Sequence, residues 1–242
     1  MRIGLGSESL SSFLDKPDAL FDFCRRAYDR NYQFIDTSPF YHNALIDALL
    51  GRYVIPKIGF SVVSKSGLAY VDLSMIRNRI TKKLGKLESK FRSESPGWRT
   101  GFSAQLLSRE ITKSLKRLNV ASHDTYLLHS APEDLDLDPF IAQLGKEKSL
   151  GRIQQIGVSL DSPTEKNYDW ADVLQVPTSL AHSSLVRHFK GNIIFNGLFR
   201  ENGKNAYVVL EELIANYPEQ SLVIGSRNIE HLHEVSIVIN RN

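Results

Sequence analysis

Short apolar segments alternate with longer amphipathic segments along the whole chain. The short segments are typical of buried strands and lie at residues 1–5, 33–36, 57–63, 125–128, 153–158, 173–176, 192–195 and 222–224. Between most of them, apolar residues recur at helical spacing, at 15–29, 43–50, 103–118, 140–148, 206–216 and 228–239. Strands that alternate with helices indicate a parallel sheet, and eight such strands indicate closure. The pattern therefore predicts an α/β protein with the (β/α)₈ TIM-barrel fold.

Proline, glycine and capping residues mark several boundaries of these elements. Pro17 suits the first turn of the helix at 15–29, and Gly51 suits the stop after the helix at 43–50. Residues 162–165, SPTE, resemble a capping box and predict a helix start. The connections after Val158 and Gln175 are short, so we expect the fifth and sixth outer helices to be reduced.

Length and composition narrow the class of protein. The 242 residues suit a compact barrel, which typically needs about 250, so we expect a single domain over 1–242. A net charge of +3 gives no reason to expect nucleic-acid binding. No apolar run approaches the roughly 18 residues of a membrane span, and no signal-peptide pattern opens the sequence. Cys24, the single cysteine, excludes an intramolecular disulfide and favours a cytoplasmic location. None of these features predicts the oligomeric state.

One long insertion interrupts the alternation, at about residues 68–101. It contains a basic run from Arg77 to Arg92 with seven lysine or arginine residues. A solvated helix face explains such a run most simply, and docking of an acidic partner is the sharper alternative.

Four polar residues stand where catalytic groups are expected in a barrel of this kind. Active sites of such barrels lie where the strands end and the following loops begin. Asp36 ends the second predicted strand, Lys65 follows the third and His129 follows the fourth. Tyr41 lies five residues after Asp36, in the same loop. Each residue alone has an ordinary structural explanation, but their joint occurrence favours a catalytic site.

Together these four groups are suited to the reduction of a carbonyl group. A free tyrosine has a pKa of about 10, and we expect a nearby lysine to lower it. Asp36 would keep Lys65 charged, Tyr41 would donate a proton to the carbonyl oxygen, and His129 would orient that oxygen. Side chains cannot supply a hydride, so a nicotinamide cofactor is required.

Five segments, taken in order, resemble the aldo-keto reductase family. They are FIDTSPFY at 34–41, SK at 64–65, SLKRL with DTYLLH at 114–118 and 124–129, GRIQQIGVS at 151–159, and IGSRNIEHLHE at 224–234. The resemblance implies Tyr41 as proton donor, Lys65 as its partner, Asp36 as the partner of Lys65, and His129 as the residue that orients the carbonyl.

The resemblance also implies a cofactor site and a choice of cofactor. Ser159 and Gln175 would contact the nicotinamide carboxamide, and Glu234 would lie near the adenine. A phosphate on the adenosine ribose would be held by the residues that enter the last helix, with the Arg227 guanidinium favouring NADP(H) over NAD(H). The residues implied in cofactor binding are Gly6, Ser7, Asp36, Ser159, Gln175, Gly225, Ser226, Arg227 and Glu234.

Departures from the family pattern keep two other hypotheses open. Leu160 stands where the family usually has asparagine, Val235 stands where asparagine usually follows the glutamate, and His42 replaces a common glycine. These changes fit a reductase-like barrel that serves as a binding or regulatory subunit. A lyase or isomerase with a Lys65 Schiff base is the third hypothesis, but it leaves Tyr41 unexplained. The remaining histidines show no metal-ligand spacing, so no metal is expected. The sequence predicts a small carbonyl substrate and does not name it.

Overall fold

Eight parallel strands form a closed barrel in chain order, as the sequence pattern predicts. The structure is a computed structural model that describes residues 1–70, 72–74 and 102–241. Each strand pairs with the next, and β8 returns to pair with β1. The strands are β1 Arg2–Gly6, β2 Tyr32–Asp36, β3 Ser61–Ser66, β4 His123–His129, β5 Ile153–Ser159, β6 Val173–Pro177, β7 Asn192–Asn196 and β8 Ser221–Ile224.

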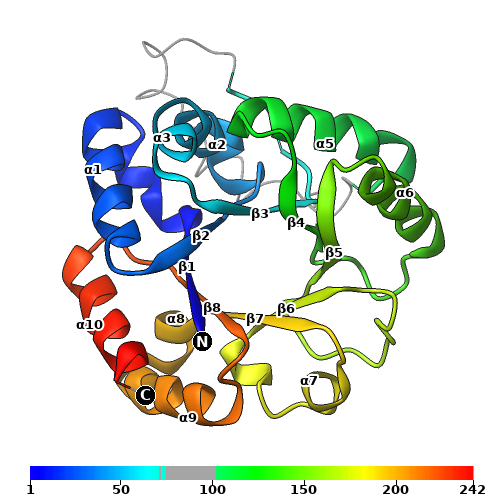
Figure 1. Ribbon diagram of the computed structural model, residues 1–242. Coiled ribbons are helices and arrows are strands. Elements are labelled where there is room, and N and C mark those ends of the chain that lie inside the picture. The colour runs from blue at the N-terminus through cyan, green and yellow to red at the C-terminus, as the bar shows by residue number, and fades with distance from the viewer. Residues whose placement is uncertain (71, 75–101, 242) are drawn as a thin grey trace, which may run out of the picture.

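The helices surround the barrel as an outer ring (Figure 1). Their apolar stripes face the strands, which is why helical spacing was visible in the sequence. In α5, for example, the buried residues are Leu107, Ile111, Ser114 and Leu118. The α-helices are α1 Pro17–Tyr28, α2 Leu45–Leu49, α3 Ile55–Ile58, α5 Ala104–Leu118, α6 Asp138–Ser149, α7 Ser184–His188, α8 Leu198–Asn202, α9 Ala206–Asn216 and α10 Ile229–Asn240.

The barrel interior is a small apolar core that is separate from the larger core under the helices. Six strands each contribute one buried side chain to it, and these are Phe34, Val63, Leu127, Val173, Ile194 and Val223. The ring of Phe34, on β2, fills the space beside Gly4 of β1. A Cβ atom at Gly4 would lie only 2.3 Å from a carbon of this ring. The interior is therefore packed, and chemistry is confined to the rim of the barrel.

The third strand begins later than predicted. The sequence pattern places it at 57–63, but Lys57 and Ile58 belong to α3 and β3 runs from Ser61 to Ser66. Pro56 stands in the first turn of α3, and Gly59, with φ of 93°, ends that helix. As a consequence, Lys65 lies inside the strand instead of after it.

Gly51 has a different role from the helix stop that the sequence suggested. It lies inside a π-helical turn, Leu50–Val54, which directly follows α2. A Cβ atom at this position would lie 2.0 Å from the carbonyl oxygen of Arg117 in α5. Glycine is therefore required because the backbones of the two segments approach closely.

The predicted helix start at 162–165 is wrong, because no helix forms between β5 and β6. The Thr164 hydroxyl instead donates to the Glu133 carboxylate. A coil over residues 160–172 covers this side of the barrel, with buried Tyr168 packed beside Trp170. The expected reduction of the outer helices is confirmed here and in α7, which has five residues.

Most of the predicted insertion at 68–101, including the basic run from Arg77 to Arg92, lies outside the described residues. Within the part of the chain that the structure describes, no helix combines the length and apolar character needed to cross a membrane.

Alanine substitution at Gly51 and at Gly145 is expected to change the free energy of unfolding in opposite directions. Gly51→Ala is expected to lower the free energy of unfolding by about 3 kcal/mol, since the new methyl group meets the backbone of α5. Gly145→Ala is the matched control. Gly145 lies in α6 with open space around its Cβ position, so alanine should raise the free energy of unfolding by about 0.5–1 kcal/mol. Urea denaturation measures both, and equal effects of the two substitutions would contradict the packing explanation.

Candidate active site

The four predicted catalytic residues meet at the carboxyl ends of β2, β3 and β4. Asp36 is the last residue of β2 and His129 is the last residue of β4. Lys65 is the penultimate residue of β3, and Tyr41 opens a short 3₁₀ turn, Tyr41–Ala44, after β2. Parallel strands bring these ends to the same rim of the barrel, so residues far apart in the sequence become neighbours.

Asp36 and Lys65 form a buried ion pair. Lys65 Nζ donates to Asp36 Oδ1 over 2.6 Å, and their side chains are only 1% and 7% exposed, respectively. Gln175 Nε2 donates to the same oxygen over 2.9 Å, while Gln175 Oε1 accepts a hydrogen bond of 2.8 Å from Ser159 Oγ. A buried charge needs such compensation, and these contacts supply it on both sides of the pair.

Tyr41 lies between Lys65 and His129. Lys65 Nζ is 5.5 Å from the centre of the Tyr41 ring, and the Tyr41 and His129 ring centres are 5.8 Å apart at an angle of 82°. Burial raises the pKa of Tyr41 well above its usual value, and the negative charge of Asp36 raises it further. The pKa of Tyr41 is therefore raised, whereas the sequence led us to expect a lowered value, because burial is the largest influence on it. The hydroxyl group stays protonated at neutral pH.

His129 is a neutral imidazole at the same rim. Burial lowers the pKa of His129 well below its usual value, and the positive charge of Lys65 lowers it further. The Ser38 hydroxyl lies 3.2 Å from Nδ1. If this hydroxyl donates to Nδ1, the imidazole keeps its hydrogen on Nε2, where it can act as a hydrogen-bond donor.

A cavity of about 390 Å³ opens in front of these groups. Asp36 of β2, Tyr41 of the turn after β2 and His129 of β4 line it, whereas Lys65 is not among its lining residues. The other lining residues are Gly6, Ser7, Glu8, Ser9, Ser159, Asp161, Gln175, Asn196, Gly197, Leu198, Phe199, Arg200, Val223, Ile224 and Gly225. Its volume is in the usual range of small-molecule sites.

The structure brings most, but not all, of the predicted cofactor residues to this cavity. Gly6, Ser7, Asp36, Ser159, Gln175 and Gly225 line it, whereas Ser226, Arg227 and Glu234 do not. The Ser226 hydroxyl accepts a hydrogen bond of 3.0 Å from the backbone of Asn228, just before α10. Arg227 is exposed at the same end of α10, and exposed Glu234 accepts a hydrogen bond from Tyr207 of α9.

Several lining residues were not singled out from the sequence. Glu8 follows β1, Asp161 follows β5, and the segment 196–200 with Arg200 follows β7. The signal that could have found them is the rule that identified Asp36 and His129, applied to the remaining strand ends.

The three departures from the family pattern have structural consequences. Leu160 and Val235 are both buried in the apolar core, so neither offers a polar group to the cavity. His42 has φ of 50° and is followed by Asn43 and Ala44, which are also left-handed. Glycine adopts this conformation without strain, whereas other residues pay about 1 kcal/mol or more each. His42 Nε2 lies 2.9 Å from the Glu8 carbonyl oxygen, a contact that helps to hold the turn.

Among residues 1–70, 72–74 and 102–241, no group of three or more histidine, cysteine or acidic side chains is placed to hold a metal ion.

Comparison with known proteins assigns the family. The family model described as the aldo/keto reductase family matches residues 2–196, so the chain belongs to that family. The match includes all four residues at the rim but ends before β8 and α10. A search of curated protein sequences gives no match.

Solved structures of aldo-keto reductases share the fold. One is a holo form from Bacillus halodurans, with a TM-score of 0.72, 14% identity and coverage of 98% of this chain and 86% of that one. A glycerol dehydrogenase from Gluconobacter oxydans has a TM-score of 0.69, 17% identity and coverage of 98% and 86%. A Klebsiella pneumoniae aldo/keto reductase in complex with NADP and acetate has a TM-score of 0.66, 20% identity and coverage of 98% and 85%.

Because the ion pair is buried, we expect that removing one partner lowers the stability strongly and that removing the second partner restores part of it. Lys65→Met leaves the Asp36 carboxylate buried without its cation and should lower the free energy of unfolding by about 3–5 kcal/mol. Asp36→Asn added to Lys65→Met removes the unpaired charge, so the double variant should regain part of this loss. Thermal and urea unfolding of the two single variants and the double variant measure the coupling. Strictly additive losses would contradict the pairing.

Proposed function

We propose that the chain reduces an aldehyde or ketone to an alcohol with NADP(H), and that Tyr41 donates the proton. The observation that carries this proposal is the cluster at the barrel rim. A protonated phenol and a neutral imidazole face one cavity, in front of a buried lysine–aspartate pair. The substrate is expected to be a small carbonyl compound, in keeping with the size of the cavity.

Tyr41 and His129 supply two hydrogen-bond donors for one carbonyl oxygen. When a hydride adds to the carbonyl carbon, the π electrons move to the oxygen, which becomes negatively charged. Donors that are already in place stabilise this charge without reorganisation. The proton then moves from Tyr41 Oη to the oxygen. The raised pKa of Tyr41 does not prevent this transfer, because an alkoxide is a much stronger base than a phenolate.

Lys65 acts on Tyr41 after the proton has left. Its ammonium group, 5.5 Å from the centre of the Tyr41 ring, stabilises the phenolate that remains. Asp36 keeps Lys65 charged and fixes its position from the adjacent strand. Lys65 is therefore expected to affect the rate without touching the substrate.

The residues around the cavity suit a nicotinamide dinucleotide phosphate. The reduced nicotinamide would supply the hydride, which no side chain can provide. Ser159, the last residue of β5, and Gln175, in the middle of β6, offer a hydroxyl and an amide suited to a carboxamide. Exposed Arg227 stands at the N-terminus of α10, a twelve-residue helix whose dipole also favours a phosphate. The Klebsiella pneumoniae structure in complex with NADP supports this choice by analogy.

A second candidate function is a binding or regulatory barrel without catalytic activity. The burial of Leu160 and Val235 in the core favours it, since two polar positions typical of the family are lost. The Schiff-base alternative is disfavoured, because a nucleophilic amine must be neutral and accessible, whereas Lys65 is buried and paired with Asp36.

Titration with NADPH and NADH tests the cofactor assignment. Wild-type protein should bind NADPH with micromolar affinity, and Arg227→Ala should weaken this binding by about 10- to 100-fold through loss of a charge-assisted contact. NADH binding should change little. Arg25→Ala, which removes an exposed arginine from α1, is the control and should bind NADPH normally. Binding of neither nucleotide at millimolar concentration would favour the non-catalytic barrel.

Replacement of the proton donor tests the mechanism. Tyr41→Phe should lower kcat for carbonyl reduction by about 10²- to 10⁴-fold, the usual contribution of a general acid, with NADPH affinity unchanged. Tyr28→Phe, on an exposed residue of α1, is the matched control and should keep full activity. A Tyr41→Phe variant with wild-type kcat would exclude Tyr41 as the donor.

A further inference from the structure

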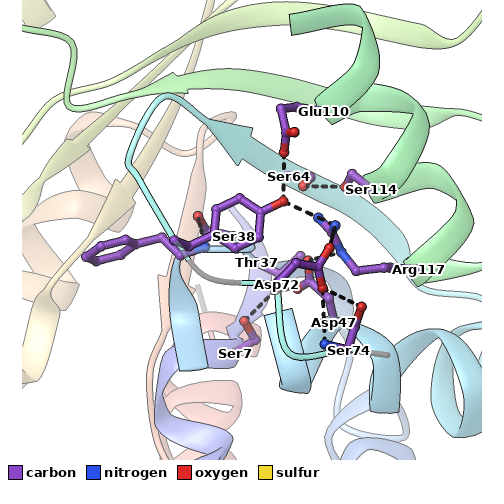
Figure 2. A network of polar contacts seen from close by, with 12 residues as sticks. Ser7, Thr37, Ser38, Asp47, Ser64, Asp72, Ser74, Glu110, Ser114 and Arg117 are labelled. Atoms are coloured by element: carbon purple, nitrogen blue, oxygen red, sulfur yellow. Dashed lines mark hydrogen bonds and ion pairs between the residues drawn. The ribbon is translucent and has the colours of Figure 1, made fainter. Parts of the chain in front are cut away.

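A chain of buried polar side chains runs beneath the barrel rim. The Ser7 hydroxyl donates to Thr37 Oγ1 over 2.7 Å, and the Thr37 hydroxyl donates to Asp47 Oδ1 over 2.6 Å. All three residues are completely buried. They come from three elements, since Ser7 follows β1, Thr37 follows β2 and Asp47 belongs to α2. Figure 2 draws these side chains together with their neighbours.

At its outer end, this chain reaches a buried arginine on α5. Arg117 Nε lies 3.8 Å from Asp47 Oδ2, and the Arg117 side chain is only 7% exposed. Arg117 Nη1 also donates to Asp72 Oδ2 over 3.0 Å and to the Tyr70 hydroxyl over 3.2 Å. Arg117 therefore compensates the charge of Asp47 and is itself held from the segment that follows β3 (Figure 2).

From its middle residue, Thr37, the chain reaches the Asp36–Lys65 pair through the backbone. Thr37 directly follows Asp36, and its amide donates to the Val63 carbonyl oxygen over 2.9 Å. Its own carbonyl oxygen lies 3.4 Å from Lys65 Nζ, which donates to it. The position of Thr37 therefore helps to fix the position of the Lys65 ammonium group, and with it the distance between this group and Tyr41.

We infer that Asp47 is a positioning residue, which acts through Thr37 to hold the Asp36–Lys65 pair against Tyr41. The inference rests on the proposed carbonyl reduction, for which Lys65 must lie close to Tyr41. A buried carboxylate is costly, and an apolar residue of similar size would fill the same space with less desolvation. The hydrogen bond to Thr37 gives the charged residue a role that an apolar one could not have.

The protonation of Asp47 gives this role a characteristic pH dependence. Burial raises the pKa of Asp47 to about 6, against the Thr37 hydrogen bond and the charges of Arg117 and Lys65, while Asp72 raises it slightly. Below this pH the carboxyl group is neutral and a weaker acceptor for the Thr37 hydroxyl. The rate should therefore fall as the pH drops through about 6.

Stability should change in the opposite direction. The pKa of Asp47 is raised from 3.8 to about 6 in the folded protein, so its contribution to stability is fully present below pH 3.8. That contribution is lost as the pH rises through about 6. A merely structural role would link the rate to stability, whereas a positioning role separates the two.

Kinetics of matched variants test the inference. Asp47→Asn and Thr37→Val should each lower kcat by about tenfold or more, since a small displacement of a catalytic group is costly, and should leave NADPH affinity within about twofold. In both variants, the fall in kcat near pH 6 should be absent. Thr37→Ser keeps the hydroxyl group and should show this fall as the wild-type protein does. Ser114→Ala is the control, because the buried Ser64–Ser114 hydrogen bond is not connected to Thr37. It should keep the wild-type kcat and pH profile. Wild-type kcat, or a persistent step, in Asp47→Asn would overturn the inference.

A nuclear magnetic resonance titration tests the role of Asp47 without relying on catalytic activity. The carboxyl carbon-13 signal of Asp36 should show a step near pH 6 in the wild-type protein. The step should become much smaller in Thr37→Val even though Asp47 still titrates, because only the direct electrostatic effect between Asp47 and Lys65 remains. A step of unchanged size in Thr37→Val would overturn the inference. A wild-type protein that neither binds NADPH nor reduces carbonyls would refute the proposed function, and the carbon-13 result would still decide the role of Asp47.

Discussion

The buried ion pair between Asp36 and Lys65 is the interaction on which the candidate site depends. It joins β2 to β3 and receives a third partner, Gln175, from β6 on the far side of the barrel. Its two charges also shift the pKa values of their neighbours, beside the larger effect of burial. The carboxylate contributes to the raised pKa of Tyr41, and the ammonium contributes to the lowered pKa of His129. Burial and this pair together raise the pKa of Tyr41 and lower that of His129, which favours a protonated phenol and a neutral imidazole, the forms used in the proposed reaction.

The barrel could be predicted from the sequence because alternation of strand and helix is a local pattern that repeats along the chain. The errors arose where a long-range contact determines the local structure. Gly51 resembles a helix stop, but its place is set by the close approach of Arg117 in α5. Residues 162–165 have the letters of a capping box, but this part of the chain packs as coil through Tyr168. Neither contact can be seen in a window of neighbouring residues.

The candidate site could be predicted from the sequence as far as the ends of the strands could be located. Asp36 and His129 end their strands, so their meeting follows from the topology, and Arg200 was missed only because the end of β7 was not considered. The direction of the Tyr41 pKa shift could not be predicted, because it depends mainly on how deeply the ring is buried. The connection from Asp47 to Lys65 is also invisible in the sequence, since it passes through the side chain and the backbone carbonyl group of Thr37.

The coil that covers β5 and β6 gives the barrel an uneven wall. Elsewhere, helices protect the strands with cooperative networks of backbone hydrogen bonds, but residues 160–172 are held largely by individual side chains such as Tyr168 and Trp170. Such a cover opens at a lower free energy than a packed helix. Amide protons of residues 160–172 should therefore exchange with solvent through local opening, whereas those of β1 and β2 should exchange only through global unfolding. Ser159 and Gln175 stand at the ends of this sector, so one side of the cavity belongs to the least cooperative part of the barrel.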